Sequence, residues 1–317
     1  MTGDSLLKSN PLWVVDVGAS GGIDPRWSEF TSFYKGVLFE PDPREYEVLK
    51  ERCENNLVVL NSALSDSPRE IDFYLCKKQQ VSSVYPPNRD FLDRFPEADR
   101  HDIVKKIRLK ADTLDNQLEN NGISEINFIK IDAQGHELPI LKGCERLLEG
   151  VVGLELEAGF VPLYKGQPLF DEMDRHVRDR GFELFDLKRY FWNRAQCENT
   201  GSQKGQLIFC DALYFKSPEK VMGLDGISKG KITCAICVYL VYGYLDLAQT
   251  LVELGARGGL FQEPERRALQ AFVSTFEKGS TIPNFRGRWR VRSCLQRMLK
   301  LFDVNGWADS DQQIGNA

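Results

Sequence analysis

Several well-known sequence patterns are missing from this chain, and each absence excludes a class of protein. The glycine-rich turn near the N-terminus has Ser20 where a dinucleotide fingerprint has its second glycine, and no Gly-Lys-Ser/Thr of a P-loop follows. The eight cysteines show no disulfide spacing, and Cys234 and Cys237 lack the further ligands of a zinc site. No secretory signal is visible, and the longest apolar stretch, residues 232–247, is shorter than the ~20 residues that span a bilayer. We expect reduced thiols, a buried helix over 232–247, no transmembrane segment and a cytoplasmic protein.

Bulk composition is ordinary for a globular protein. Of the 317 residues, 42% are hydrophobic and 27% charged, so the chain can bury one large core and carry an accessory unit. The formal net charge of −5 disfavours a general nucleic-acid binder, which needs a strongly basic surface. Function must therefore be inferred from local motifs.

Apolar runs of strand length alternate with helical intervals from residue 13 to residue 188. The predicted strands are 13–17, 36–40, 57–61, 126–132, 151–157, 182–187 and 207–215. This rhythm predicts a doubly wound, mostly parallel α/β sheet of seven strands, in which a hairpin makes one strand antiparallel. Residues 69–75 and 106–111 are predicted as extra strands around a proline-containing loop. We place a first domain at 1–218 and a small α-helical C-terminal domain or extension at 219–317.

The turn after the first predicted strand carries the strongest functional signal. Glycines in Asp16-Val-Gly18-Ala-Ser-Gly21 let the backbone turn without a Cβ clash, so a ligand can approach the main chain. Glu40 ends the next predicted strand, where a carboxylate can accept both hydrogen bonds of a ribose diol. The turn lacks the second glycine with which a dinucleotide fingerprint binds pyrophosphate. S-adenosylmethionine, which carries a zwitterionic amino acid in place of phosphates, therefore suits the turn better than a dinucleotide does. The alternative is a tight glycine turn in an ordinary α/β domain.

A second motif follows the fourth predicted strand and makes a family resemblance specific. The motifs, in chain order, are Asp16-Val-Gly-Ala, Phe39-Glu-Pro41, Ala63-Leu-Ser-Asp66, Thr113-Leu-Asp115, Lys130-Ile-Asp-Ala-Gln-Gly-His-Glu137, Leu141-Lys-Gly143 and Glu155-Leu-Glu157. Over roughly residues 12–216 they resemble the FkbM family of S-adenosylmethionine-dependent methyltransferases. The resemblance implies a class I, Rossmann-like methyltransferase and O-methylation of a hydroxyl on a glycan, glycolipid, polyketide or other secondary metabolite. One departure is Gln134, where the family often has Glu.

The resemblance and the strand-end argument together predict a set of cofactor-binding residues. We expect the methionine part to contact the turn, the ribose to contact Glu40, and the adenine to lie beside the residues after the second and third strands. The predicted residues are Asp16, Gly18, Ala19, Ser20, Gly21, Glu40, Pro41, Asp42, Ser62, Ala63 and Asp132. For Asp42, a plain turn role in Pro-Asp-Pro is the alternative.

Asp132, His136 and Glu137 are the predicted catalytic residues, because the carboxyl end of a strand opens into the ligand crevice. An alcohol needs its proton drawn away, and His136 is the preferred base; Asp132 with Glu157 could instead hold a divalent cation, although no metal ligands are assigned. Alternatively, Asp132 caps a helix or contacts the cofactor, and the other two occupy the first turn of that helix. Candidate substrate-facing residues, with an ordinary loop role as the alternative, are Ser82, Ser83, Tyr85 and Tyr164.

The C-terminal part contains a basic segment that the resemblance does not cover. Residues 278–300 hold seven Lys or Arg and no acid, interleaved with apolar residues, and could contact an acidic substrate, an anionic partner or a membrane surface. The alternative is a solvated basic helix that packs by its apolar side. A non-catalytic scaffold that uses this segment is the second hypothesis for function. A nucleic-acid methyltransferase is disfavoured, since no Asn/Asp-Pro-Pro-Tyr signature is present. The identity of the hydroxyl acceptor, a metal requirement and a homo-oligomeric state stay open.

Overall fold

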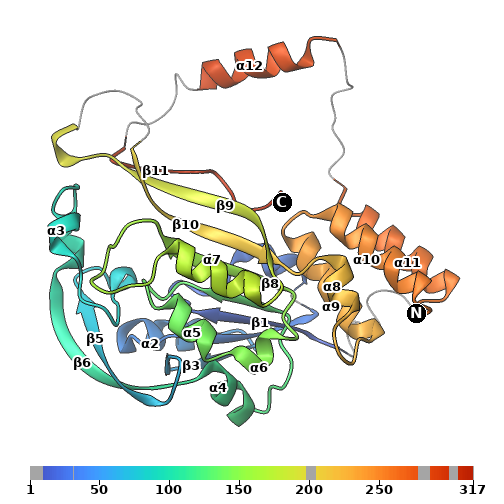
Figure 1. The fold of residues 1–317 in the computed structure, drawn as a ribbon, viewed down its shortest axis with the longest axis horizontal. Coiled ribbons are helices and arrows are strands. Elements are labelled where there is room, and N and C mark those ends of the chain that lie inside the picture. The colour runs from blue at the N-terminus through green and yellow to red at the C-terminus, as the bar shows by residue number, and fades with distance from the viewer. Residues whose placement is uncertain (1–9, 31, 198–204, 278–285, 300–305, 317) are drawn as a thin grey trace.

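The computed structural model describes residues 10–30, 32–197, 205–277, 286–299 and 306–316 (Figure 1). A sheet of eight strands forms its centre, in the order β11-β9-β10-β8-β7-β1-β2-β3. The strands are β1 (Leu12–Val17), β2 (Tyr34–Phe39), β3 (Leu57–Leu60), β7 (Phe128–Ile131), β8 (Gly153–Gly159), β9 (Glu183–Trp192), β10 (Gln206–Phe215) and β11 (Ala308–Ser310). Five neighbouring strands, β8, β7, β1, β2 and β3, run parallel, whereas β10 is antiparallel to both β8 and β9. The sheet is therefore α/β in class and mixed in direction.

The prediction of seven strands was wrong by one, because β11 joins the sheet edge antiparallel to β9. All three of its residues are exposed, so no apolar alternation marks them in the sequence. The strand is held at its end by Asp311, whose Oδ2 accepts hydrogen bonds from the backbone N–H of Arg189 at 2.9 Å and from its Nε at 2.8 Å. An ion pair between distant residues, rather than a local pattern, thus places the eighth strand.

A second, three-stranded sheet contains the two extra strands that the sequence predicts. Its order is β4 (Ala63–Leu64), β6 (Ile103–Asp112) and β5 (Arg69–Cys76), with β5 and β6 antiparallel. The connection between β5 and β6 contains η2 (Gln79–Val81), α3 (Arg89–Leu92) and η3 (Ala98–His101). Its first residues return to β5, because the backbone N–H of Tyr74 donates to the carbonyl of Ser83 at 2.8 Å. This connection supplies one wall of the pocket described below.

Alternating side chains of the central strands divide the core into two layers. Val15 and Val17 of β1 pack with apolar residues of four helices on one face of the sheet, whereas Leu12 and Val14 point to the other face. The helices of the first face are α4 (Leu114–Asn120), α5 (Glu137–Lys142), α6 (Glu145–Leu148) and α7 (Phe170–Asp179). The remaining N-terminal helix is α2 (Pro43–Arg52), which begins at the capping residue Asp42.

The opposite face is covered by helices from the C-terminal part of the chain (Figure 1). These are α8 (Pro218–Met222), α9 (Lys229–Val241), α10 (Leu245–Arg257) and α11 (Glu263–Ser274). Between β1 and β2 the chain forms only the short η1 (Pro25–Phe30), so α9 fills the place beside the sheet. Cys234 and Cys237 lie in this apolar cluster, as free, buried thiols. The division of the chain at residue 218 stays a prediction, but the two parts share one core.

The C-terminal segment leaves this core and returns to it. After α11 comes α12 (Arg288–Leu299), which stands apart from the body in Figure 1, and residues 306–316 lie against the sheet again. Ile314 is buried, and the backbone N–H of Asn316 donates to the carbonyl of Tyr242 at 2.8 Å. None of the helices in the described ranges is long and apolar enough to cross a membrane.

Candidate active site

An open pocket lies at the carboxyl ends of β1, β2, β3 and β7, with the β5–β6 connection on its far side. The space between its walls amounts to about 850 Å³, with open solvent at its mouth included. The carboxyl ends of parallel strands meet at this edge, so residues far apart in sequence converge here. The polar residues that line it are Ser20, Glu40, Asp42, Glu45, Ser62, Gln79, Gln80, Ser82, Lys130, Asp132, Gln134 and His136.

Gly18 joins the ends of β1 and β7. Its φ is +78°, and a Cβ atom at this position would lie 1.9 Å from the carbonyl oxygen of Asp132. Its backbone N–H donates to the carbonyl of Phe39 at 2.9 Å. Gly21 also has a positive φ of +89° but faces open space. The first glycine is therefore required by a close approach of two strand ends, and the second by backbone conformation alone.

Asp16 lies behind this turn and does not line the pocket. It is fully buried, with Lys130 Nζ 3.7 Å from its Oδ1, and this oxygen has no hydrogen-bond partner among the described residues. Burial raises the pKa of Asp16 to about 6, although Lys130 opposes the shift. Lys130 lies among several carboxylates, since against the effect of burial the charges of Asp16, Asp132, Glu155 and Asp211 all raise its pKa.

Glu40 is buried at the end of β2 and faces the pocket. Its Oε1 accepts the backbone N–H of Asp42 at 2.8 Å, and its carbonyl accepts Asn61 Nδ2 at 2.8 Å. Burial raises the pKa of Glu40 to about 7, because one backbone hydrogen bond does not replace the lost water. A ligand that offers further hydrogen-bond donors to Glu40 would therefore stabilise its ionised carboxylate.

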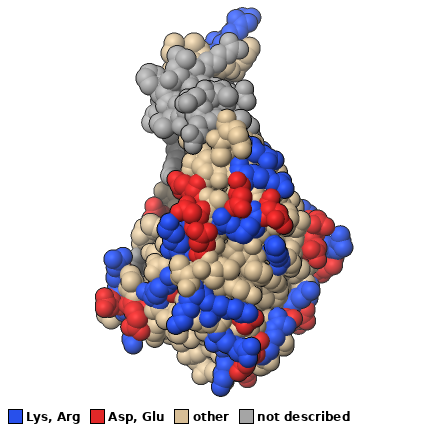
Figure 2. All heavy atoms as spheres, turned by 90° about the vertical axis from the view of Figure 1, so that its left-hand side faces the viewer, with Lys and Arg blue, Asp and Glu red and all other residues tan. Residues whose placement is uncertain are grey.

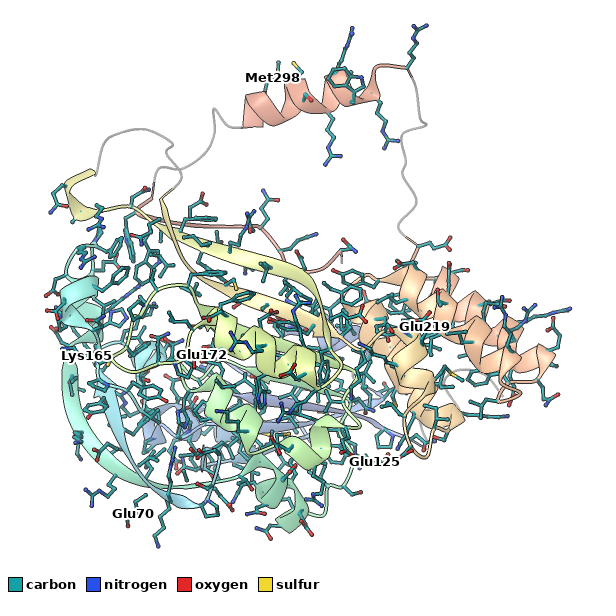
Figure 3. The ribbon with its side chains drawn as sticks, in the orientation of Figure 1. Glu70, Glu125, Lys165, Glu172, Glu219 and Met298 are labelled. Carbon is teal, nitrogen blue, oxygen red and sulfur yellow. The ribbon has the colours of Figure 1, made fainter. Side chains whose placement is uncertain are left out.

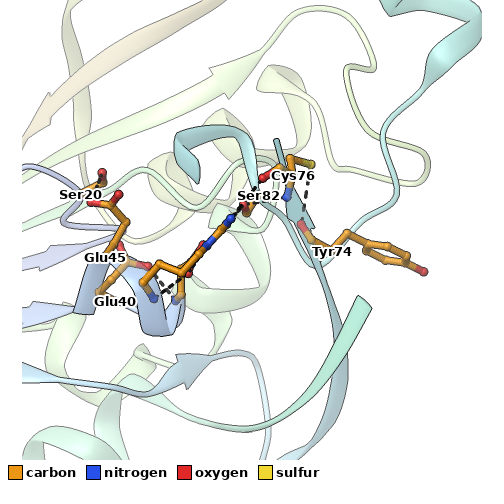
Figure 4. Close-up of polar contacts among 8 residues, drawn as sticks. Ser20, Glu40, Glu45, Tyr74, Cys76 and Ser82 are labelled. Atoms are coloured by element: carbon orange, nitrogen blue, oxygen red, sulfur yellow. Dashed lines mark hydrogen bonds and ion pairs between the residues drawn. The ribbon is translucent and has the colours of Figure 1, made fainter. Parts of the chain in front are cut away.

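Arg44 connects helix α2 with the connection between β5 and β6. Asp42, the capping residue of α2, accepts Arg44 Nη2 at 2.5 Å, and the same guanidinium lies 3.5 Å from Ser82 Oγ and from the carbonyl of Cys76. Figure 4 shows Ser82 next to Cys76, whose backbone N–H donates to Ser82 Oγ at 3.1 Å. Asp42 therefore has the predicted turn role and also lines the pocket.

Most of the predicted cofactor residues border the pocket. Those that line it are Gly18, Ser20, Glu40, Pro41, Asp42, Ser62, Ala63 and Asp132, whereas Asp16, Ala19 and Gly21 do not. Ser20 donates from its hydroxyl to Glu45 Oε2 at 3.1 Å, as Figure 4 shows. Glu45, Gln79 and Gln80 line the pocket as well and were not predicted. Nothing local marks these residues, because a helix and a distant loop bring them to the strand ends.

Gln134 bridges two carboxylates beside the pocket. Its Nε2 donates to Asp132 Oδ1 at 2.8 Å and to Glu157 Oε2 at 3.0 Å, while its Oε1 accepts the hydroxyl of Tyr164 at 2.8 Å. The two carboxylates fix the orientation of the amide, since a carbonyl oxygen between them would be repelled by both. Burial and then the Asp132 charge raise the pKa of Glu157 well above its ordinary range.

The turn that carries Gln134 is strained and anchored. Gln134 has a φ of +51°, a left-handed conformation that side chains other than glycine rarely adopt. Ser83 Oγ donates to the Gln134 carbonyl at 2.7 Å. Ser83 and Tyr164 are both buried, so they hold this turn, whereas Ser82 alone of the predicted substrate-facing residues lines the pocket.

His136 lines the pocket and is buried. Its Nε2 lies 3.1 Å from Ser65 Oγ, and its Nδ1 lies 3.4 Å from the Tyr85 hydroxyl. Because the Ser65 hydroxyl donates to Asp66 Oδ1 at 3.1 Å, Nε2 carries the proton and Nδ1 remains an acceptor. Burial and then the Arg69 charge lower the pKa of His136 to about 4, so the ring is neutral at pH 7.

Glu137 faces away from the pocket and shapes the loop before α5. Its Oε1 accepts the backbone N–H groups of Ala133 at 2.9 Å and of Gly135 at 3.0 Å. Burial raises its pKa to about 7 against the effect of these hydrogen bonds. The residue therefore occupies the first helical turn, as the alternative from the sequence has it, and supports the loop. Within the described residues, no three His, Cys, Asp or Glu side chains form a metal-binding group.

The Methyltransferase FkbM domain model matches residues 16–184, which contain both the glycine turn and the Asp132 loop. The chain belongs to the FkbM methyltransferase family. As a member it is a methyltransferase enzyme, and S-adenosylmethionine is the cofactor expected of this family. Every residue that lines the described pocket of this FkbM methyltransferase lies within the matched segment.

Three known proteins are similar to this FkbM methyltransferase at low sequence identity. A 2-O-methyltransferase, NoeI, from Sinorhizobium fredii is 26% identical over 176 residues, or 51% of this chain and 70% of that protein. Among solved structures, a TehB-like SAM-dependent methyltransferase from Corynebacterium glutamicum is 12% identical, with a TM-score of 0.32 over 68% of this chain and 89% of that one. Human methyltransferase-like protein 13 in complex with SAH is 10% identical, with a TM-score of 0.32 over 93% of each chain.

Proposed function

We propose that this protein transfers a methyl group from S-adenosylmethionine to a hydroxyl oxygen of a glycan, glycolipid, polyketide or other secondary metabolite. The observation that carries the proposal is the pocket in which Glu40, at one strand end, faces the Asp132 loop at another. A nucleoside held at Glu40 has its other end beside Asp132 and His136. The relative named 2-O-methyltransferase supports transfer to oxygen, although it aligns with about half of this chain.

The residues of the pocket fit the cofactor. Glu40 offers a buried carboxylate to the ribose diol, and Ser62 and Ala63 lie where the adenine edge would pass. The Gly18 turn offers its backbone to the methionine part. Asp16, with one oxygen lacking a hydrogen bond among the described residues, supplies negative charge behind the turn. When bound, S-adenosylmethionine supplies an electrophilic methyl group on a sulfonium.

His136 is the base in this proposal. The neutral ring presents Nδ1 as an acceptor, and its present partner, the Tyr85 hydroxyl, lies at a long 3.4 Å. An acceptor hydroxyl in that place could donate its proton to Nδ1 as the oxygen attacks the methyl group in line. Glu137 acts through the loop backbone and is a positioning residue.

Gln134 provides the two N–H donors that hold Asp132 and Glu157 together, a role that a bound cation could otherwise fill. Gln134→Glu would replace these donors with a third carboxylate. We expect a loss of stability of roughly 1–3 kcal/mol from the unpaired acids and a partial recovery with Mg²⁺, measured by thermal unfolding. Gln134→Met, which removes the donors without adding charge, is the control and should not respond to Mg²⁺.

The compartment proposed for the enzyme is the cytoplasm. The structure records seven free cysteines, and five of them are buried. Buried free thiols at such number are typical of proteins that fold in a reducing compartment. Counting free thiols of the denatured protein purified from its source, with and without reductant, tests this: a difference between the two counts would contradict it.

Calorimetry with S-adenosylhomocysteine tests the cofactor site. We expect binding by the intact protein and a roughly 10- to 100-fold loss for Glu40→Ala, because the diol loses its charged acceptor. Glu70→Ala, which removes an exposed carboxylate of β5, is the matched control and should bind normally. Absence of binding by the intact protein would overturn the proposal.

A transfer assay then tests the acceptor. Radiolabelled methyl transfer from S-adenosylmethionine to cellular glycans, lipids and metabolites should yield a product whose label is stable as an ether. Label found only in RNA, DNA or protein would refute transfer to the proposed class. Label found nowhere, with cofactor binding retained, would favour the scaffold hypothesis.

A further inference from the structure

Helix α12 exposes an unusual amount of apolar surface. Eight large hydrophobic residues of the described chain are exposed, and four of them lie on this one helix. The four are Trp289 (67% exposed), Val291 (49%), Leu295 (56%) and Met298 (54%). Figure 3 shows Met298 on α12, which lies apart from the folded body. The sequence alternative, a basic helix that packs by its apolar side, is therefore not what the structure shows.

The apolar side chains are arranged as one face. Val291, Leu295 and Met298 follow one another at intervals of four and three residues, which places them on the same side of a helix. Trp289 lies on another side, next to Arg290, whose guanidinium carbon is 5.5 Å from the centre of the indole ring. The helix therefore exposes an apolar stripe on one side and Trp289 on the side away from it.

Charge on this helix has one sign. Arg288, Arg290, Arg292 and Arg297 are its ionisable residues apart from Cys294, and none is acidic, in a chain whose formal net charge is −5. Part of this basic surface is visible in blue at the upper tip of Figure 2, where α12 lies. The segment therefore has the opposite charge to the protein as a whole and lacks internal acids to neutralise it.

These features select among the surfaces that could cover α12. A second copy of the helix would bury the stripe but would bring arginines against arginines. A nucleic acid would neutralise the arginines but would leave the apolar stripe in water. An anionic bilayer satisfies both, because the stripe enters the acyl boundary and arginines reach lipid phosphates.

We propose that α12 binds the surface of an anionic lipid bilayer, with Val291, Leu295 and Met298 inserted and the arginines on the headgroups. The helix lies in the interface and does not cross it, since it has only 12 residues. This inference is independent of the methyl-transfer reaction. It adds a place of action, because an enzyme held there meets acceptors carried on lipids or delivered to the membrane.

Vesicle co-sedimentation of the full chain tests the proposal. We expect binding to phosphatidylcholine vesicles that contain phosphatidylglycerol, and about tenfold weaker binding to pure phosphatidylcholine. Arg290→Gln with Arg292→Gln should weaken binding roughly 30-fold, and Arg290→Lys with Arg292→Lys should retain it. Leu295→Asn with Met298→Asn should weaken it about tenfold. Val104→Asn, at an exposed apolar residue of β6, is the matched control and should have no effect.

Tryptophan fluorescence gives a second readout. Because Trp289 lies on the side of α12 away from the stripe, Leu295→Trp in a Trp289→Phe chain carries the probe. Its emission should shift to the blue when anionic vesicles are added, because the indole then moves from water into the interface. Absence of vesicle binding, or equal binding by the double Arg→Gln variant, would overturn the proposal. Self-association that Leu295→Asn abolishes in the absence of lipid would overturn it in favour of a second copy, and tight RNA binding in favour of a nucleic acid.

Discussion

The pocket and helix α12 both concentrate charged residues, but they differ in where the partners of those residues lie. In the pocket the carboxylates of Asp132 and Glu157 are held by the amide of Gln134, and Glu40 by a backbone N–H. On α12, Arg290, Arg292 and the apolar stripe are exposed to solvent. The pocket is thus organised before a ligand arrives, whereas α12 is suited to a surface outside the molecule. Substitutions in the pocket should change cofactor binding or chemistry, and those on α12 should change location alone.

The largest effect is expected where the two strand ends meet. Gly18→Ala places a Cβ atom 1.9 Å from the Asp132 carbonyl, so the ends of β1 and β7 must separate. We expect loss of S-adenosylhomocysteine binding and a fall in unfolding free energy of more than about 3 kcal/mol. Gly21→Ala, which meets no atom within 4 Å, should cost only roughly 1 kcal/mol of backbone strain. Thermal unfolding measures the stability of the two variants, and calorimetry measures their S-adenosylhomocysteine binding. Equal effects of the two substitutions would show that the ends of β1 and β7 can separate without loss of the pocket.

Chemistry should be the next most sensitive property. His136→Gln should lower kcat roughly 100-fold, since the base is lost, while affinity for S-adenosylhomocysteine changes by less than about twofold. Tyr85→Phe removes the hydroxyl beside Nδ1 but leaves the base, and should retain most activity. Initial rates against cofactor concentration separate the two parameters. If the His136 variant kept the kcat of the intact protein, His136 would not be the base, and Asp132 would be assigned that role.

A pH dependence should follow from Glu40. Burial raises its pKa to about 7 from an ordinary 4.5, so its contribution to stability is fully present below about pH 4.5 and is lost as the pH rises through 7. Glu40→Gln should therefore make the ligand-free protein more stable at about pH 8, by roughly 2 kcal/mol, and leave it unchanged near pH 4. Cofactor affinity of the intact protein should rise as the pH passes 7, because the ionised carboxylate accepts from the diol.

Denaturant unfolding and calorimetry at both pH values check the Glu40 prediction. The variant should lose the pH dependence of affinity together with that of stability. If the variant were less stable than the intact protein at pH 8, ionisation of Glu40 would not destabilise the fold. Water would then reach the Glu40 carboxylate more than its burial indicates.

The smallest effect is expected for α12. Leu295→Asn with Met298→Asn should leave the methylation rate of a water-soluble acceptor within about twofold of the intact protein, because α12 contributes no residue to the pocket lining. The same assay with the acceptor embedded in anionic vesicles should slow roughly tenfold. A lower rate on the soluble acceptor would show that α12 and the pocket are coupled.

The sequence predicts the central strands well, because buried parallel strands are continuous apolar runs. It predicts Glu40 beside the Gly18 turn for the same reason, since the ends of neighbouring parallel strands must meet. Strand β11 escapes prediction because the Arg189–Asp311 ion pair, rather than its own residues, places it. A buried helix is predicted over 232–247, but α9 ends at Val241 and α10 begins at Leu245, and the position of α9 on the sheet is not predicted.

Details within the site depend on contacts that no local pattern contains. Gln134 stands out in the sequence only as a departure from a family pattern, yet its amide organises two acids and a tyrosine. Gln79 and Gln80 reach the pocket through the fold of the β5–β6 connection. The placement of Glu137 behind the loop is decided by two backbone N–H groups that the sequence cannot rank against a catalytic role.

The return of residues 306–316 to the sheet has a consequence for limited proteolysis. Trypsin can cut the exposed Arg290 or Arg292 of α12, but the piece that follows remains attached through Asp311 on Arg189, the buried Ile314 and the backbone bond from Asn316 to Tyr242. The cleaved protein should therefore migrate as one species in native gel filtration and separate into two only after denaturation. Breaking the chain there would leave two fragments that share one fold.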